Sequence, residues 1–265
     1  MTKVCFAGVT GWTAPPILAA IHDSDDLTLV AGVSRSAAGR ALTDVTGVDA
    51  NGQVYGGVAE ALAAVPIDVL VDYTSAAAVK DNVETAVDAG VHVVVGTSGL
   101  TADDYSALDE RARAQRVGVI AAGNFSVMAA ILRRAATMAA EHLDHWEVID
   151  YASDIKPDVP SGTSRELAET LAQVRRPAPG LPAEDVHGPI EARGVEVAGT
   201  RIHSVRLPTF VVTTEIVFAN AGERLVIRHD PGPNPELYVA GTLLAIRKVT
   251  DAVGVRRGLD SLLYD

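Results

Sequence analysis

The sequence predicts an α/β protein of two domains: a parallel sheet covered on both faces, and an α+β domain with an open, mostly antiparallel sheet. As far as residue 125, unbroken apolar runs typical of buried parallel strands alternate with amphipathic helical segments. Between residues 194 and 230, β-favouring runs follow one another with no helix between them. A chain of 265 residues that is 48% hydrophobic is long and apolar enough to build both cores.

The first predicted strand, residues 3–7, ends in a glycine turn that leads into a helix ending at His22. Gly8, Gly11 and Ala14 match the dinucleotide-binding fingerprint, in which the first glycine makes a tight turn and the second lets the backbone approach a pyrophosphate. This order predicts a Rossmann-type doubly wound sheet; a purely structural turn is the alternative. The predicted cofactor contacts in the turn are Gly8, Gly11, Trp12 and Thr13.

The second predicted strand, residues 27–33, indicates which cofactor is bound. NAD sites usually place an acidic residue after this strand to bind the ribose hydroxyls, whereas a 2′-phosphate needs cations and small donors. Here Ser34, Arg35 and Ser36 follow the strand, and a guanidinium can bind phosphate through two hydrogen bonds. We therefore predict NADPH, with NADH possible; a merely solvated arginine is the alternative.

The alternation then continues to the end of the first domain. Helices are predicted at 58–64 and 76–89 and from the cap Thr101 to Gln115, and strands at 67–73, 91–95 and 117–121. Loops at the carboxyl ends of parallel strands carry ligands. The predicted cofactor contacts in these loops are Tyr73, Thr74, Gly96, Thr97, Ser98, Asn124 and Phe125.

The second domain opens with a predicted helix, residues 127–142, and a strand that leads into the loop Lys156-Pro-Asp-Val-Pro-Ser-Gly-Thr163. A helix is predicted directly after this loop, at 165–174. A Ser-Gly-Thr turn at a helix start offers hydroxyls and unpaired backbone N–H groups at the positive end of the helix dipole, which suits a carboxylate or phosphate. The predicted substrate-binding residues are Lys156, Ser161, Gly162 and Thr163.

The open sheet is predicted from four β runs that follow a proline-rich loop at 177–189. The runs are 194–197, 200–206, 209–218 and 223–230. The apolar residues of the third run cannot all face one way, so we expect sheets to associate into a homo-oligomer. A last helix, 236–253, would return to the first domain. The expected domains are 1–125, completed by 235–265, for the dinucleotide, and 126–234 for substrate binding and oligomerisation.

Composition argues against several classes of protein. With 22 basic and 34 acidic side chains, the formal net charge of −12 disfavours nucleic acid as a partner. The single cysteine, Cys5, excludes a disulfide framework, and His203 and His229 lack a second ligand at a useful spacing, so we expect no metal site. No apolar run approaches the ~20 residues that span a bilayer, and no secretory signal opens the chain, so we expect a cytoplasmic protein without membrane contact.

The motifs taken together resemble the dihydrodipicolinate reductase family, NAD(P)H-dependent enzymes that reduce a cyclic, carboxylated imine on the lysine and diaminopimelate route. The likeness is spread over most of the chain. It implies a Rossmann domain completed by the C-terminal segment, an inserted substrate domain, and usually tetramers joined through the open sheets. The matching segments are 8–14, 72–74, 96–99, 124–126, 156–163, 202–206 and 222–224 with His229.

The chain departs from this family just ahead of the lysine. The family carries a His-His pair there, the first proposed as proton donor and the second as a substrate contact, whereas this chain has Ala152 and Ser153. A basic residue that the family places after His229 is also absent. We therefore hypothesise an imine reductase for a related but different substrate that bears one carboxylate. The candidate proton relays are Tyr151, Asp154 and Lys156.

Two alternatives stay open at this point. One is a genuine 4-hydroxy-tetrahydrodipicolinate reductase of lysine and diaminopimelate biosynthesis. The other is an NADPH-binding sensor that has lost catalysis, which the missing histidines motivate and the retained lysine argues against.

Overall fold

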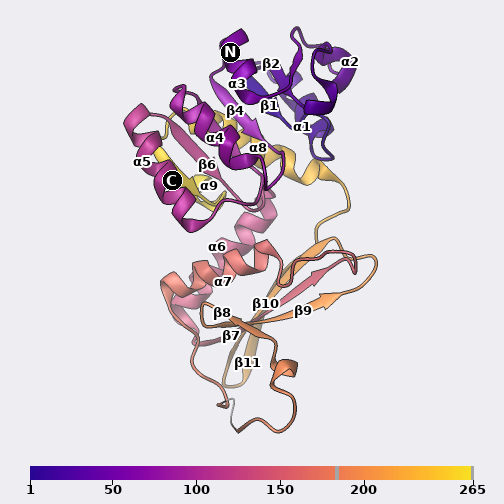
Figure 1. Cartoon of the computed structure of the whole chain (residues 1–265). Coiled ribbons are helices and arrows are strands. Elements are labelled where there is room, and N and C mark those ends of the chain that lie inside the picture. Colours follow the sequence, from indigo (N-terminus) through magenta and orange to yellow (C-terminus); the bar gives the residue numbers. More distant parts are fainter. Residues whose placement is uncertain (183–184, 264–265) are drawn as a thin grey trace. The chain divides into compact units, whose positions relative to one another are not determined.

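The computed structural model describes residues 1–182 and 185–263, which divide into two compact units (Figure 1). The first unit is Met1–Val127 together with the segment from Asn234, and the second is Met128–Pro233. Each unit has its own hydrophobic core. The C-terminal segment, yellow in Figure 1, therefore belongs to the same unit as the N-terminal strands.

The first unit is built on a seven-stranded sheet in the order β12-β6-β5-β4-β1-β2-β3, in which every neighbouring pair is parallel. All residues of β4 and β6 are buried, as expected for strands covered on both faces. The doubly wound sheet is thereby confirmed. The strands are β1 (Thr2–Ala7), β2 (Leu27–Val33), β3 (Val54–Tyr55), β4 (Val69–Asp72), β5 (His92–Val95), β6 (Gly118–Ala121) and β12 (Gly254–Arg257).

Helices cover both faces of this sheet, with α1 and α8 packed on one face and α3, α4 and α5 on the other. Helix α5 begins with the expected cap, because Thr101 Oγ1 accepts from the Asp104 backbone N–H while the Asp104 carboxylate accepts from the Thr101 backbone N–H. The helices are α1 (Ala14–His22), α2 (Leu42–Thr46), α3 (Val58–Ala64), α4 (Val79–Asp88), α5 (Ala102–Gln115), α8 (Val239–Val249) and α9 (Asp260–Leu263), with 3-10 turns η1 (Arg35–Ala37) and η4 (Pro235–Tyr238).

The last predicted helix, 236–253, was too long. Helix α8 ends at Val249, and the chain turns at Gly254, which has a φ of +86°, into the edge strand β12 beside β6. A positive φ favours glycine and breaks the helical pattern there. The apolar residues before Gly254 therefore close a turn and do not continue the helix.

The second unit is a five-stranded sheet in the order β11-β10-β7-β9-β8, in which β7 and β9 are parallel and the other neighbours are antiparallel. The open, mostly antiparallel sheet is thus confirmed. Helix α7 begins at Gly162, three residues before the expected start, with Ser161 as its N-cap. The elements are α6 (Val127–His142), β7 (His145–Ala152), α7 (Gly162–Val174), η3 (Ile190–Arg193), β8 (Val195–Val197), β9 (Thr200–Arg206), β10 (Val212–Asn220) and β11 (Glu223–His229).

Helices α6 and α7 cover one face of this sheet (Figure 1). The hydrophobic core of the second unit lies between these two helices and that face of the sheet. In β7 the even-numbered residues 146–152 are buried against these helices, whereas the odd-numbered ones are half-buried or exposed on the other face. One face of β7 is therefore packed against the helices, and the other is partly exposed.

Three further findings bear on function. None of the helices that the structure describes is long and apolar enough to span a bilayer. Within the described ranges, no group of three or more His, Cys, Asp or Glu side chains is arranged to hold a metal ion. Burial, with a smaller contribution from the charge of Asp72, raises the pKa of the Cys5 thiol to about 12, so this thiol stays protonated in the core.

Candidate active site

A pocket of about 320 Å³ lies in the first unit where the strand order reverses, between β1 and β4. The loops after β1, β2, β3 and β4 line it, which is where ligands bind in doubly wound sheets. Six predicted cofactor residues line this pocket: Gly8, Gly11, Ser34, Arg35, Tyr73 and Thr74.

The glycine turn after β1 requires residues without a side chain. Gly8 has a φ of +96°, and a Cβ there would lie 2.2 Å from the Tyr73 carbonyl oxygen. A Cβ on Gly11 would lie 3.0 Å from the Gly8 carbonyl oxygen. Thr13 follows as the N-cap residue of α1. The turn therefore brings bare backbone to the start of a helix, as pyrophosphate binding requires.

The loop after β2 presents hydroxyl groups beside a guanidinium. Ser34 Oγ lies 3.0 Å from Thr10 Oγ1 and 3.1 Å from Ser36 Oγ, and Arg35 and Ser36 are exposed. Thr10 also lines the pocket, although the sequence alone did not mark it. This loop therefore presents three hydroxyl groups and one guanidinium that can form hydrogen bonds to a ligand.

A buried carboxylate organises the loops after β4 and β5. Asp72 is fully buried and accepts hydrogen bonds from Thr74 Oγ1 at 2.8 Å, Asn82 Nδ2 at 2.8 Å and Thr97 Oγ1 at 2.6 Å. The Thr74 backbone N–H also donates to Thr97 Oγ1 at 2.7 Å. Asp72 thus brings together Thr74 and Thr97, two of the residues predicted to contact the cofactor. Sequence reasoning missed Asn82, which lines the pocket from α4 and follows no recognisable motif.

The other predicted cofactor residues lie outside the lining of this pocket. Trp12 is exposed and its ring meets the Tyr238 ring edge-on, with centroids 6.3 Å apart. A Cβ on Gly96 would lie 2.4 Å from the Tyr73 ring, so packing alone requires this glycine. Phe125 is buried with its ring centroid 5.9 Å from that of Tyr73. The residues in this group are Trp12, Thr13, Ser36, Gly96, Thr97, Ser98, Asn124 and Phe125.

In the second unit, the loop between β7 and α7, residues 153–161, is called the lysine loop. Its lysine and the start of α7 both contact one carboxylate, that of Asp158. Lys156 Nζ lies 2.7 Å from Asp158 Oδ1, and both side chains are half-buried. Burial raises the pKa of Asp158, but the hydrogen bond from Lys156 and the backbone N–H of Gly162 lower it further, so the net shift is downward. The lysine ammonium and the first turn of α7 therefore act on the same carboxylate.

The predicted substrate-binding residues at the start of α7 differ in how accessible they are. Ser161 is buried, and its Oγ accepts from the Ser164 backbone N–H at 3.4 Å as the N-cap of the helix. Gly162 is exposed and Thr163 is half-buried. The hydroxyl of Ser161 therefore serves the helix, and the accessible groups of this turn belong to Gly162 and Thr163.

The candidate proton relays do not lie together: Tyr151 is on the sheet, whereas Asp154 and Lys156 are in the lysine loop. The Tyr151 ring is on the open face of the sheet, 5.1 Å from the Phe210 ring and 4.9 Å from the guanidinium carbon of Arg228. The neighbouring residues of β7 face α6 and α7 instead. Asp154 is exposed in the lysine loop, where Ser153 Oγ donates to its carboxylate at 3.1 Å. Tyr151 therefore lies on the face of the sheet opposite to α7, whereas Asp154 and Lys156 belong to the loop that leads into α7.

The two residues that stand in place of a histidine pair differ in their surroundings. Ala152 is fully buried on the helix-covered face, and Ser153 is half-buried at the start of the lysine loop. A larger side chain at Ala152 would have to displace packed neighbours, whereas Ser153 has room. Alanine has no polar side-chain group, and a serine hydroxyl donates hydrogen bonds but does not ionise near neutral pH as a histidine does.

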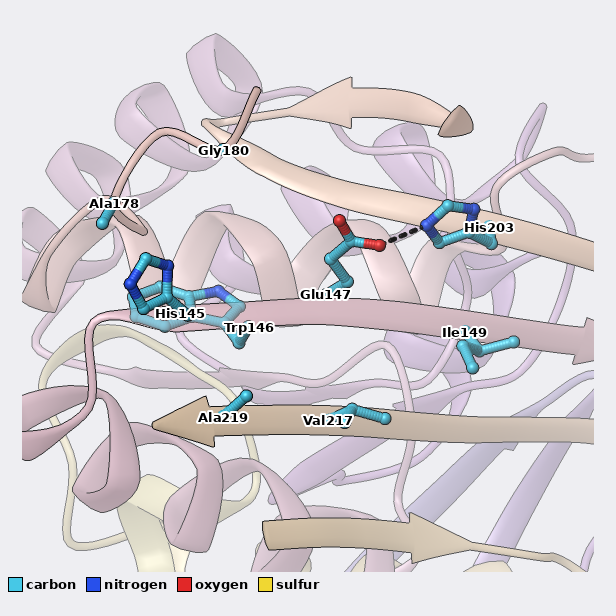
Figure 2. Close-up of a pocket in the computed structure, with 9 residues that line it drawn as sticks. All are labelled: His145, Trp146, Glu147, Ile149, Ala178, Gly180, His203, Val217 and Ala219. Carbon is cyan, nitrogen blue, oxygen red and sulfur yellow. Dashed lines mark hydrogen bonds and ion pairs between the residues drawn. The ribbon is translucent and has the colours of Figure 1, made fainter. Parts of the chain in front are cut away.

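A larger pocket, of about 480 Å³, lies elsewhere in the second unit, on the open face of its sheet (Figure 2). Figure 2 shows Glu147 pointing toward His203, whose Nε2 lies 2.6 Å from Glu147 Oε2; Arg193 also pairs with Glu147. None of the predicted substrate or cofactor residues lines this pocket. Its lining is His145, Trp146, Glu147, Ile149, Ala178, Gly180, His203, Val217 and Ala219.

Comparison with known protein families accounts for nearly the whole chain. The family model described as dihydrodipicolinate reductase, N-terminus, matches residues 2–125, and the model described as dihydrodipicolinate reductase, C-terminus, matches residues 125–263. The chain belongs to the dihydrodipicolinate reductase family. The resemblance seen in the sequence motifs is therefore confirmed.

Relatives within this family match over nearly their full length. The 4-hydroxy-tetrahydrodipicolinate reductase of Halalkalibacterium halodurans is 37% identical over 268 residues, covering 100% of this chain and 97% of the relative. That of Moorella thermoacetica is 35% identical over 264 residues, covering 98% and 97%.

One solved structure agrees with this assignment, and a second shares the fold alone. A dipicolinate-bound dihydrodipicolinate reductase from Paenisporosarcina sp. TG-14 superposes with a TM-score of 0.80 at 26% identity, covering 98% of this chain and 99% of that one. An amine dehydrogenase from Mycobacterium smegmatis shares the fold, with a TM-score of 0.64 at 14% identity, covering 96% and 94%.

Proposed function

We propose that this chain is an NADPH-dependent reductase that transfers a hydride to the C=N bond of a small, cyclic imine bearing one carboxylate. The observation that carries the proposal is the convergence of Lys156 and the first turn of α7 on a single carboxylate, that of Asp158. A substrate carboxylate would take the same partners. Membership of a family of imine reductases supports the reaction class.

The pocket at the strand-order reversal is the proposed nucleotide site. When bound, a reduced nicotinamide supplies the hydride. Gly8 and Gly11 would let the pyrophosphate approach the backbone, and Ser34, Arg35 and Ser36 would hold a 2′-phosphate, which favours NADPH while leaving NADH possible. The remaining predicted contacts, Trp12, Thr13, Tyr73, Thr74, Gly96, Thr97, Ser98, Asn124 and Phe125, are assigned to the same ligand.

The proposed reaction does not require the missing histidines. An alkyl imine can already be protonated near neutral pH, so hydride addition at the iminium carbon gives an amine whose nitrogen keeps the proton it brought. A ketone would instead need a donor for the new hydroxyl. Lys156 would bind the carboxylate and orient the ring, with Gly162 and Thr163 beside it. Asp154 and Lys156 remain the candidate groups for any proton exchange.

The choice of substrate rests on Ala152 and Ser153. In the family, the histidine pair serves the standard substrate, so its replacement favours a ring with one carboxylate fewer. The second candidate function is reduction of 4-hydroxy-tetrahydrodipicolinate itself, which the names of the relatives at 35–37% identity favour. A panel of five- and six-membered cyclic imino acids, run beside that compound with NADPH oxidation followed at 340 nm, separates the two. Nucleotide binding without consumption across the panel would instead favour a sensor.

We also propose that the protein is a cytoplasmic homo-oligomer joined through the open sheet face of the second unit. That face carries half-buried apolar side chains such as Ile149 and Val217 around the pocket in Figure 2. An unpartnered sheet face of this kind suits self-association, and the family resemblance suggests a tetramer. Light scattering should give a multiple of the 27.6 kDa chain mass; the mass of one chain would remove this proposal.

A further inference from the structure

An ion pair between a buried carboxylate and a half-buried guanidinium contacts the lysine loop. Asp150 on β7 is fully buried, and its Oδ2 lies 2.8 Å from Nη2 of Arg206 at the end of β9. A charge this deep in a protein persists only where hydrogen bonds replace the water it has lost. The contacts of the two side chains therefore show what the pair holds in place.

The Asp150 carboxylate joins the start of α7 to strand β9. It accepts from the Ser161 backbone N–H at 2.9 Å and from Ser164 Oγ at 3.2 Å, both at the start of α7. It also accepts from Ser204 Oγ on β9 at 3.1 Å. Burial raises the pKa of Asp150, but the hydrogen bonds from Ser161 and Arg206 lower it further, so the group is ionised at neutral pH.

Arg206 connects the interior of the lysine loop to the same carboxylate. Its Nη2 donates to the carbonyl oxygen of Asp158 at 2.8 Å as well as to the Asp150 carboxylate, and its Nη1 donates to the Asp150 carbonyl oxygen at 3.1 Å. Asp158 is the residue whose carboxylate pairs with Lys156. One planar guanidinium thus connects the lysine loop, the sheet and, through Asp150, the helix start.

We propose that Asp150 and Arg206 are positioning residues that hold Lys156 and the first turn of α7 at the separation a substrate carboxylate needs, without touching the substrate. This inference rests on the proposed function, because it assumes that Lys156 and the first turn of α7 bind the substrate carboxylate. The competing explanation is that the pair stabilises the fold only. The two explanations differ in what happens to carboxylate affinity in variants that remain folded.

Two matched serine variants separate these explanations while leaving the ion pair intact. Ser164→Ala and Ser204→Ala each remove one hydroxyl from the same carboxylate, at 3.2 and 3.1 Å, but only Ser164 belongs to α7. We expect Ser164→Ala to raise the KM for the imino acid severalfold and Ser204→Ala to leave it unchanged. In both variants kcat and the KM for NADPH should stay within about twofold of wild type. Equal effects of the two variants on carboxylate affinity would overturn the proposal.

Arg206→Lys is the stronger perturbation. An ammonium can neutralise Asp150, but it cannot reproduce the planar fork that also reaches the Asp158 carbonyl oxygen. We expect a protein that still folds, shown by its urea midpoint, with a KM for the imino acid raised roughly tenfold. A folded Arg206→Lys protein with wild-type affinity would also overturn the proposal. If this variant does not fold, the serine pair decides alone.

A binding measurement keeps this test apart from the test of the function. The dissociation constant of pyridine-2-carboxylate, measured by calorimetry, should rise in Ser164→Ala and in Arg206→Lys by the same factors as KM. If the wild type reduces no imino acid but binds this ligand with that dependence, the proposed reaction fails and the positioning role stands. If the wild type binds no carboxylate ligand at all, both fail.

Discussion

Removing the charge of Lys156 should weaken binding of the carboxylated substrate and spare the nucleotide. In the structure Nζ lies 2.7 Å from a carboxylate oxygen of Asp158, and the lysine side chain is 29% exposed. A hydrogen bond between charged groups contributes ~1.5–3 kcal/mol, and partial exposure screens it toward the lower part of that range. A loss of about 2 kcal/mol corresponds to a ~30-fold rise in KM for Lys156→Met.

The assay is the KM for the imino acid at saturating NADPH, with the Kd of NADPH measured by fluorescence in the same variant. The matched control is Lys80→Met, because Lys80 Nζ makes a similar contact, 2.6 Å from Asp104, on the surface of the first unit. That control should leave both constants unchanged. An unchanged KM in Lys156→Met, or an equal loss of NADPH affinity, would refute the reasoning.

Three further predictions concern individual residues. Asp158→Asn should lower the KM for the imino acid roughly two- to fivefold, because the lysine loses an internal competitor for the substrate; a raised KM in steady-state kinetics would contradict this. Arg35→Ala should raise the Kd of NADPH roughly tenfold and change that of NADH less than about twofold, as measured by fluorescence titration; equal losses for both nucleotides would show that Arg35 does not read the 2′-phosphate. The pKa of Asp150 is lowered on folding, so its contribution to stability is present above the ordinary value of 3.8 and is lost as the pH falls through the lowered value. The urea midpoint should therefore drop as the pH is taken from about 5 to about 3, and it should drop less in Asp150→Asn.

Most of the fold follows from local sequence patterns. Strands β1, β2, β4, β5 and β6 are apolar runs between amphipathic helices, and such runs are typical of a parallel sheet covered on both faces. Strand β3 has two residues, too few for any periodicity. Strand β12 carries Arg256 and Arg257 at the sheet edge, and the short turn that separates it from α8 continues the apolar pattern of that helix. Edge strands need not be apolar on both faces, so hydrophobic pattern alone cannot find them.

The candidate site also has a part that local sequence predicts and a part that it does not. The segment 156–163 is local, so its lysine, its turn and its helix start were visible in the sequence. The structural part played by Ser161 was not visible, because its backbone N–H donates to Asp150, 11 residues earlier. Arg206 contacts Asp150, which lies 56 residues earlier in the chain. Spacing along the chain carries no signal for such contacts, which only the pairing of β7 with β9 brings together.

The substrate panel tests the central claim most directly. NADPH oxidation by the purified protein, measured as kcat/KM, compares cyclic imino acids that bear one carboxylate with 4-hydroxy-tetrahydrodipicolinate. We predict the higher value for a substrate with one carboxylate, because Lys156 and the start of α7 provide for one such group and Ala152 and Ser153 replace the histidine pair. A higher value for 4-hydroxy-tetrahydrodipicolinate, or oxidation with neither class, would contradict it.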